Sequence, residues 1–165
     1  MLNELSKLVQ GNKFVEYMAE NQLRYIAADA SERLKKISGG RYAIEILDGE
    51  FIIRDDFCGG RKRYPNTLSG GEVFLTSFAL ALSLSNRIQM RSNAPMRFFF
   101  LDEGFGTLDH NTLETVMNSL NTLIGSGMTV GVITHVDAVK EQLPVKLEVI
   151  PASPGEHGSI VKMIC

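Results

Sequence analysis

The stretch TLSGGEVFLTSFALALSLS, residues 67–85, joins a helix start to a long apolar segment. Its Ser69 and Glu72 have the spacing of a capping box, in which the serine accepts a hydrogen bond from a backbone N–H and the glutamate accepts one from the serine's own N–H. The residues that follow are apolar on most sides, which is typical of a buried helix. We therefore predict a helix that begins beside Ser69 and ends near Met90.

Two glycines, Gly70 and Gly71, occupy the first turn of this helix. Glycine is costly there because it loses more conformational freedom on folding than any other residue, and a cap alone does not need it. Without side chains, the two backbone N–H groups would stand open at the positive end of the helix dipole, where phosphate oxygens bind well. The pair therefore favours an anion site, with a simple helix cap as the alternative.

Two acids end the next apolar run. FFFLDE, residues 98–103, is typical of a fully buried parallel strand, followed by Asp102 and Glu103 at its end. Open α/β sheets place their ligands at the carboxyl ends of such strands. One acid could hold Mg²⁺ through its oxygens, and the other could orient or deprotonate an attacking water. The alternative is that both acids only end the strand and face water.

A second apolar run, MTVGVIT at residues 128–134, predicts another buried strand and is followed by His135. Strand–helix–strand alternation from residue 97 onward predicts a layer that contains parallel strands. Neighbouring strand ends would then bring the Asp-Glu pair and His135 into one crevice. The alternative is a hydrogen-bonded structural histidine.

The other segments predict short, regular elements. Residues 13–36 have helical periodicity, and Asp48-Gly49 between two alternating runs is typical of a hairpin turn. The basic run Arg61-Lys62-Arg63 is expected in a solvated loop, with a DNA or phosphate contact as the alternative. Further expectations are a weak helix over 1–10, loops over 58–66 and 92–95, a helix N-capped by Asp109, a short helix at 138–142 and closing strands at 145–150 and 159–165.

The composition is that of an ordinary globular domain, with 165 residues, 44% hydrophobic, 22% charged and a formal net charge of -2. This balance does not indicate a strongly basic nucleic-acid-binding domain. The cysteines, Cys58 and Cys165, are too few and too far apart for a disulfide framework or a CxxC metal site. We recognise no signal peptide and no apolar run of the roughly 18 residues that a membrane span needs. A cytoplasmic protein without a membrane partner is therefore expected.

The order of these motifs resembles the second half of an ABC-type ATPase. LSGGE (68–72) is similar to the signature motif, FFFLDE to the Walker B strand, GTLD (106–109) to the D-loop, and His135 to the switch histidine. Within that superfamily, the flanking residues resemble the SbcC type of SMC-like DNA-repair ATPase. A helix ending in GGRY (39–42) precedes a hairpin, and the Walker B strand runs into DEGFGTLD (102–109).

This resemblance implies an α/β fold, the C-terminal half of an ABC-type P-loop ATPase head. It would have a partly parallel sheet flanked by helices, an N-terminal β-hairpin and a helix from the base of a coiled coil. Residues 1–37 would form the coil-base helix and residues 38–165 the lobe. The sequence contains no G-x-x-x-x-G-K-[ST]. The Walker A loop is therefore expected on an N-terminal lobe of the same protein, and the isolated chain is expected to be inactive.

The resemblance also implies ATP and Mg²⁺ as cofactors, with roles for particular residues. Its partners would be the N-terminal ATPase lobe, a second ATPase head in a homodimer, an SbcD-like nuclease and DNA. The implied assignments are Glu103 as general base, His135 as γ-phosphate sensor, Asp102 as the Mg²⁺-side acid, and Ser69, Gly70, Gly71, Glu72 and Asp109 as nucleotide-binding residues.

Two other classes stay open at this point. One is an SMC- or RecN-like ATPase that organises DNA and has no nuclease partner. The other is a transporter ATPase subunit, against which the coil-like N-terminal helix argues, because a membrane-coupling segment would be expected there. Transporters also more often show LSGGQ and DEP where this chain has LSGGE and DEG.

Overall fold

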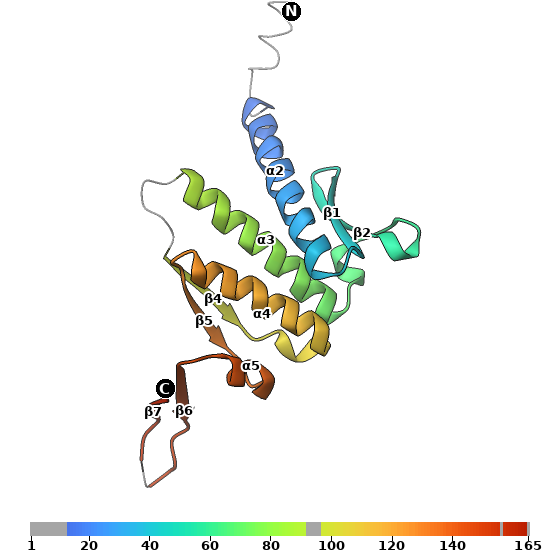
Figure 1. Ribbon diagram of the computed structural model, residues 1–165. Helices are drawn as coiled ribbons and strands as arrows, with labels where there is room; N and C mark the ends of the chain where they lie inside the picture. The colour runs from blue at the N-terminus through green and yellow to red at the C-terminus, as the bar shows by residue number, and fades with distance from the viewer. Residues whose placement is uncertain (1–12, 92–96, 156, 165) are drawn as a thin grey trace, which may run out of the picture.

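The computed structural model describes residues 13–91, 97–155 and 157–164 (Figure 1). Three long helices lie at its centre, with a small sheet beside α2 and a parallel strand pair beside α4. The weak helix expected over 1–10 and the loop expected over 92–95 lie outside the described residues. The elements are α2 (Lys13–Ile37), β1 (Tyr42–Leu47), β2 (Glu50–Asp55), η1 (Asp56–Cys58), β3 (Arg61–Arg63), η2 (Pro65–Thr67), α3 (Gly70–Arg91), β4 (Phe98–Asp102), η3 (Phe105–Thr107), α4 (His110–Gly125), β5 (Thr129–Ile133), α5 (Asp137–Gln142), β6 (Lys146–Ile150) and β7 (Ile160–Ile164).

The helices bury a common core, in which α2 packs along α3 and against β1. Leu34 on α2, Phe78 on α3 and Val116 on α4 are all buried there. The predicted helices over 13–36 and up to Met90 are confirmed to within one residue at their ends. The expectation that α3 is buried on most sides is wrong for the described chain, since Val73, Leu84 and Ile88 are exposed.

The predicted hairpin forms the first two strands of a three-stranded antiparallel sheet, β1–β2–β3. Its turn has φ of 51° at Asp48 and 81° at Gly49, the left-handed values that a tight hairpin turn requires. The loop predicted for the basic run is wrong, because Arg61–Arg63 pairs with the edge of β2. Three adjacent charged residues have no alternation of apolar and polar side chains, so the sequence gives no strand signal. They form a strand because they pair with the neighbouring strand β2.

The parallel layer is confirmed, because β4 and β5 pair in parallel from Phe98 opposite Thr129 to Asp102 opposite Ile133. The prediction that β4 is fully buried is wrong for the described residues. Phe99 is only 8% exposed and meets Phe78 of α3, whereas Phe98 is 59% and Phe100 71% exposed. The described chain therefore covers one face of this strand pair with helices and leaves the other open.

The closing strands are confirmed as an antiparallel hairpin, β6–β7, which extends away from the helices (Figure 1). The short helix expected at 138–142 is α5. Across the hairpin, Leu147 pairs with Met163 and Val149 with Val161, and all four side chains are exposed. Within the described residues, no helix is long and apolar enough to cross a membrane.

Phe74 on α3 locks the start of that helix against the turn that follows β4. Its ring centroid lies 6.0 Å from that of Phe78 and 5.2 Å from that of Phe105. The ring also fills the space beside Gly104, where an added Cβ would lie 2.2 Å from a ring carbon. Gly104 has φ of 97°, so both its conformation and its surroundings require glycine.

We predict that Gly104→Ala lowers the free energy of unfolding by about 2–4 kcal/mol, because left-handed backbone strain adds to overpacking against the Phe74 ring. Urea denaturation followed by circular dichroism measures this change. Gly127→Ala is the matched control, since Gly127 has φ of 88° but no heavy atom within 4 Å of an added Cβ. The control should lose only about 1 kcal/mol. Equal losses in the two variants would show that the Phe74 contact adds nothing.

Candidate functional site

The candidate site is built around the β4–α4 turn, residues 103–109. Its first residue, Glu103, has φ of 57°, a left-handed conformation that is uncommon for a residue with a side chain. The Glu103 N–H donates to the carbonyl oxygen of Ile133 at 2.9 Å, which joins the ends of β4 and β5. The chain thus turns sharply where the strand ends, and the Glu103 side chain faces the neighbouring strand end.

Glu103 and His135 lie together, as expected for residues at neighbouring parallel strand ends. The distance from His135 Nδ1 to Glu103 Oε2 is 2.7 Å, and the side chains are 76% and 47% exposed, respectively. A contact this exposed contributes little to stability, so its main effect is to orient both groups. With Nδ1 at the carboxylate, the Nε2 atom of His135 lies on the side of Gly106, 3.7 Å from the position of a Cβ there.

Asp102 lies at the carboxyl end of β4 and is exposed. Across the described ranges, no group of three His, Cys, Asp or Glu side chains is placed to hold a metal ion. Mg²⁺ does not need such a cage in ATP-dependent sites, because it keeps several waters and takes phosphate oxygens as ligands. One exposed carboxylate at a strand end therefore fits Mg²⁺ as a single protein ligand, with substrate and water supplying the others.

The capping box at the start of α3 is confirmed. The Ser69 N–H donates to Glu72 Oε2 at 2.7 Å, and the Glu72 N–H approaches the Ser69 hydroxyl oxygen at 3.4 Å. The helix begins at Gly70, immediately after the serine. The box therefore fixes the serine next to the first turn of α3, at the positive end of the helix dipole.

The two glycines have a packing role that the sequence did not reveal. A Cβ on Gly71 would lie 3.0 Å from the carbonyl oxygen of Thr107, and one on Gly70 would lie 3.3 Å from the Thr107 methyl carbon. The start of α3 thus packs closely on the β4–α4 turn. This contact explains the glycines in part without any bound anion, and it places Ser69 beside the turn that carries Glu103.

Asp109 is the N-cap of α4, as predicted. One of its carboxylate oxygens accepts from the Thr112 N–H at 3.0 Å, and the other accepts from the Thr112 hydroxyl at 2.6 Å. These bonds, above all that of the Thr112 side chain, lower the pKa of Asp109. Both oxygens are occupied by the cap, so Asp109 is held firmly at the end of the β4–α4 turn.

Two residues at the site, Tyr42 and Arg63, were missed by the sequence analysis. The Tyr42 hydroxyl donates to Glu72 Oε1 at 2.6 Å, and Arg63 Nη1 lies 2.8 Å from the same oxygen. Arg63 also donates to the carbonyl oxygen of Thr67. Burial raises the pKa of Glu72, but the bonds from Arg63, Tyr42 and the Ser69 backbone outweigh it and bring it to about 2. Burial and the bond to Glu72 raise the pKa of Tyr42 to about 12.

Ion pairs neutralise most of the basic run at 61–63. Lys62 pairs with Glu45 at 3.2 Å across the sheet, and Arg63 pairs with Glu72. Arg61 is exposed. Because two of the three cations already face carboxylates of the same chain, this strand offers little free charge for a phosphate backbone, and the alternative of a DNA contact is weakened.

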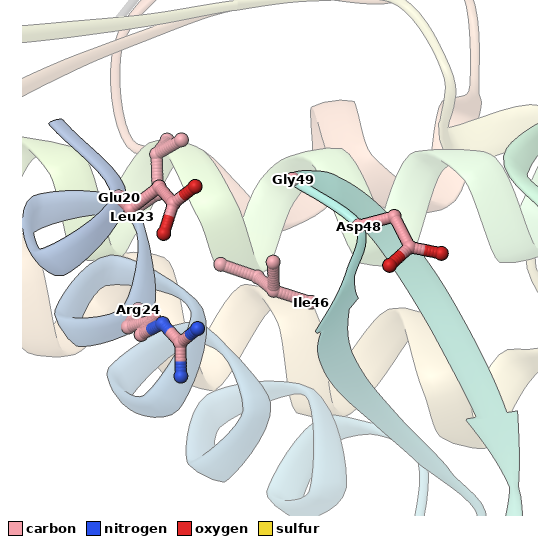
Figure 2. Close-up of a pocket in the computed structure, with 6 residues that line it drawn as sticks. All are labelled: Glu20, Leu23, Arg24, Ile46, Asp48 and Gly49. Carbon is pink, nitrogen blue, oxygen red and sulfur yellow. The ribbon is translucent and has the colours of Figure 1, made fainter. Parts of the chain in front are cut away.

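A pocket of about 230 Å³ lies away from these residues, between α2 and the β1–β2 turn (Figure 2). Glu20, Leu23 and Arg24 line it from α2. None of its lining residues is a predicted site residue; the opposite wall is formed by Ile46, Asp48 and Gly49. The groups at the β4–α4 turn thus form an exposed edge rather than the lining of this pocket.

Known proteins resemble this chain both in fold and in sequence. The chain has the fold of an SMC head domain, with a TM-score of 0.67 and 23% identity to the Smc head domain with a coiled coil and joint derived from Pyrococcus yayanosii, covering 99% of this chain and 30% of that one. A second solved structure, from work on ATP-driven dimerization and DNA-stimulated activation of SMC ATPases, matches with a TM-score of 0.68 and 20% identity over 90% of this chain and 89% of that one.

The sequence matches are more specific. The SbcC/RAD50-like family, defined by its Walker B motif, matches residues 57–122. The SbcC subunit of the nuclease SbcCD from Clostridium acetobutylicum is 57% identical over 164 residues, which is 99% of this chain and 14% of that protein. The chain is therefore similar in sequence to SbcC/RAD50-like proteins, and it spans only that small part of the length of the relative it matches. The resemblance recognised from the motifs is confirmed.

We predict that Glu72→Gln lowers the free energy of unfolding at pH 7 by about 2–3 kcal/mol and that this loss disappears in acid. The folded-state pKa of Glu72, about 2, lies below its ordinary value of 4.5. Its stabilisation is therefore fully present above about pH 4.5 and is lost as the pH falls through the folded-state pKa. Denaturant titrations at several pH values measure the difference. Glu114→Gln, at an exposed site on α4, should change stability by less than about 0.5 kcal/mol at every pH. A difference for Glu72→Gln that does not vary with pH would contradict this assignment.

Proposed function

We propose that this chain is the C-terminal lobe of an SMC-like ATPase head, in which ATP hydrolysis drives the processing of DNA ends together with a partner nuclease. The observation that carries the proposal is the Glu103–His135 pair at 2.7 Å, because Glu103 lies on the turn that packs against Gly70 and Gly71. A general base, its orienting partner and an anion-binding helix start thus lie along one exposed edge. The SbcC/RAD50-like sequence supports the same reading.

Glu103 acts as the general base in this proposal. His135 occupies Oε2, while the described residues provide no partner for Oε1. That second oxygen can accept a hydrogen bond from the attacking water and take its proton as the water attacks the γ-phosphate. The backbone bond from Glu103 to Ile133 fixes the main chain from which the carboxylate extends, and His135 orients the carboxylate itself. In phosphoryl transfer, a protein contributes mainly by positioning the reacting groups and not by forming covalent bonds itself.

His135 reports on the γ-phosphate. With Nδ1–H donating to Glu103, Nε2 is an acceptor in neutral histidine and a donor only in protonated histidine. A phosphate oxygen needs a donor, so His135 contacts it either as the protonated imidazolium or after the ring releases Glu103. Either change alters the hydrogen bond to Glu103. The sensor and the base are therefore linked through one bond.

Mg²⁺ would be held at Asp102 through a carboxylate oxygen, directly or through water. When bound, it neutralises charge on the ATP phosphates. Ser69, Gly70 and Gly71 would bind the γ-phosphate of an ATP held by a second head, because the segments 67–72 and 102–109 contain no lysine or arginine to grip it. Asp109, fixed by Thr112, would couple the two sites across the dimer.

The partners in this proposal are an N-terminal lobe with the Walker A loop, a second head, an SbcD-like nuclease and DNA. A second candidate is an SMC- or RecN-like DNA-organising ATPase without a nuclease, which the fold shared with the Smc head supports. Affinity purification from cells that express the full-length protein separates the two. A stoichiometric nuclease partner supports the first candidate, and its absence under low-salt conditions supports the second.

We predict that Glu103→Gln traps ATP and stabilises the two-head dimer. The test protein is a chimera in which this chain replaces the matching 164-residue segment of the C. acetobutylicum relative. Losing the base should lower kcat at least about 100-fold with little change in ATP affinity. Glu141→Gln, on the exposed side of α5, is the control and should hydrolyse ATP at the parent rate. The 165-residue chain by itself should show no Mg²⁺-dependent turnover. Parent-rate hydrolysis by the chimera with Glu103→Gln would contradict the base assignment.

We predict that Ser69→Arg in the same chimera abolishes ATP-driven head association while leaving ATP binding to separate heads nearly intact. A bulky side chain at the start of α3 would block a phosphate that arrives from the opposite head, not the primary pocket. Loss of the serine cap should cost only about 0.5–2 kcal/mol, so the lobe should still fold. Nucleotide titration and light scattering with ATP measure the two properties. Ser77→Arg, the same change at a position on α3 away from the helix start, is the control. Normal dimerisation of the Ser69 variant would refute the role across the dimer.

A further inference from the structure

We propose that Glu72 is a positioning residue for Ser69 rather than a nucleotide ligand, held by Tyr42 and Arg63, and that this contact ties the start of α3 to helix α2. The inference rests on the proposed function, since it assigns a role within the same site. It concerns the network of Tyr42, Arg63, Ser69 and Glu72, called here the Glu72 network.

The carboxylate of Glu72 has little capacity left for a ligand. Oε1 accepts from both Tyr42 and Arg63, at 2.6 and 2.8 Å, and Oε2 accepts from the Ser69 N–H at 2.7 Å. The Glu72 side chain is 15% exposed and that of Arg63 is 23% exposed, so the pair is well shielded. A carboxylate would also repel the oxygens of a triphosphate. Its chemistry therefore suits holding Ser69, not binding ATP.

The Glu72 network connects the start of α3 to two strands of the three-stranded sheet. Tyr42 is the first residue of β1, and Arg63 is the last residue of β3. Arg63 additionally donates to the carbonyl oxygen of Thr67, just before the helix. Ser69 is thus fixed from both sides, through its own N–H and through the backbone that leads into it.

The sheet is in turn fixed to α2 by serine hydroxyls. The Tyr42 N–H donates to the Ser38 hydroxyl oxygen at 3.0 Å, and the Ile44 N–H donates to the Ser31 hydroxyl oxygen at 2.9 Å. Ser31 lies on α2, and Ser38 directly follows it. A continuous set of hydrogen bonds therefore runs from α2 through β1 and Tyr42 to Glu72 and Ser69. A shift of α2 along its axis would move the group that holds the serine.

The first experiment uses the 165-residue chain itself and hydrogen–deuterium exchange. Arg63→Gln and Tyr42→Phe should each speed exchange of the amides from Ser69 to Val73 by about tenfold, the effect of losing one charge-assisted hydrogen bond. Arg63→Lys keeps the charge and should restore part of the protection. Arg54→Gln is the matched control, because Arg54 lies on the neighbouring strand and pairs with Glu45 and Asp56 instead. Equal exchange in the Arg63 and Arg54 variants would overturn the inference.

The second experiment measures ATP-driven association and ATP affinity in the chimera described above. Arg63→Gln should weaken head association at least about tenfold and leave the ATP affinity of separate heads unchanged, with Arg63→Lys intermediate and Arg54→Gln at the parent value. A merely structural role would lower both properties together. A loss of head association in Glu72→Gln that Arg63→Gln and Tyr42→Phe do not share would show that Glu72 binds the nucleotide across the dimer, and it would overturn the inference.

The Ser69→Arg variant separates a failure of the proposed function from a failure of the positioning role of Glu72. If it leaves association intact, the proposed function fails, whatever the Arg63 variants do. If it abolishes association while Arg63→Gln behaves as Arg54→Gln does, the proposed function stands and the positioning role of the Glu72 network is wrong.

Discussion

The contact between the Phe74 ring and Gly104 decides the geometry of the whole site. Because Gly104 has no side chain, the Phe74 ring can lie directly against its backbone. This contact holds the first turns of α3 against the turn that follows β4. With that contact in place, Gly71 reaches the carbonyl oxygen of Thr107 and Glu103 turns toward His135. Two segments about 30 residues apart in the chain therefore lie together along one edge. The left-handed backbone at Glu103 is held by its hydrogen bond to Ile133 and by the contact of its side chain with His135.

Features that depend on nearby residues could be predicted from the sequence. The capping box at Ser69, the N-cap at Asp109 and the Asp48-Gly49 turn all follow from side chains within a few positions of the backbone groups they satisfy. The meeting of Glu103 and His135 was also predictable, since parallel strands with a helical connection bring their carboxyl ends to one edge. Local chemistry and one topological rule were sufficient for these elements.

Features that depend on distant partners could not be predicted in the same way. Arg61–Arg63 is a strand because it pairs with the edge of β2, and Arg63 reaches Glu72 only through the three-dimensional arrangement of β3 and the start of α3. The sequence favoured an open anion site as the reason for the glycine pair, whereas the close approach of Thr107 also requires small residues there. The exposure of Phe98 and Phe100 contradicts the predicted buried strand. An apolar run indicates that a strand tends to be buried, but it does not say which segment buries it.

Within the proposed function, the charge of the exposed edge decides the order in which its residues can meet ATP. The segment 102–109 carries three acids and no lysine or arginine, and 67–72 adds Glu72. A triphosphate approaching these carboxylates alone would be repelled, and the N–H groups at the start of one helix provide only about half a positive charge. Within the proposed function, ATP must therefore already be neutralised by cations from another segment before Ser69 and Glu103 meet it. An edge of this kind detects a bound nucleotide more readily than it captures a free one. In that proposal, the 47% exposure of Glu103 and the 76% exposure of His135 follow from this order, because the segment that would cover them arrives with the nucleotide.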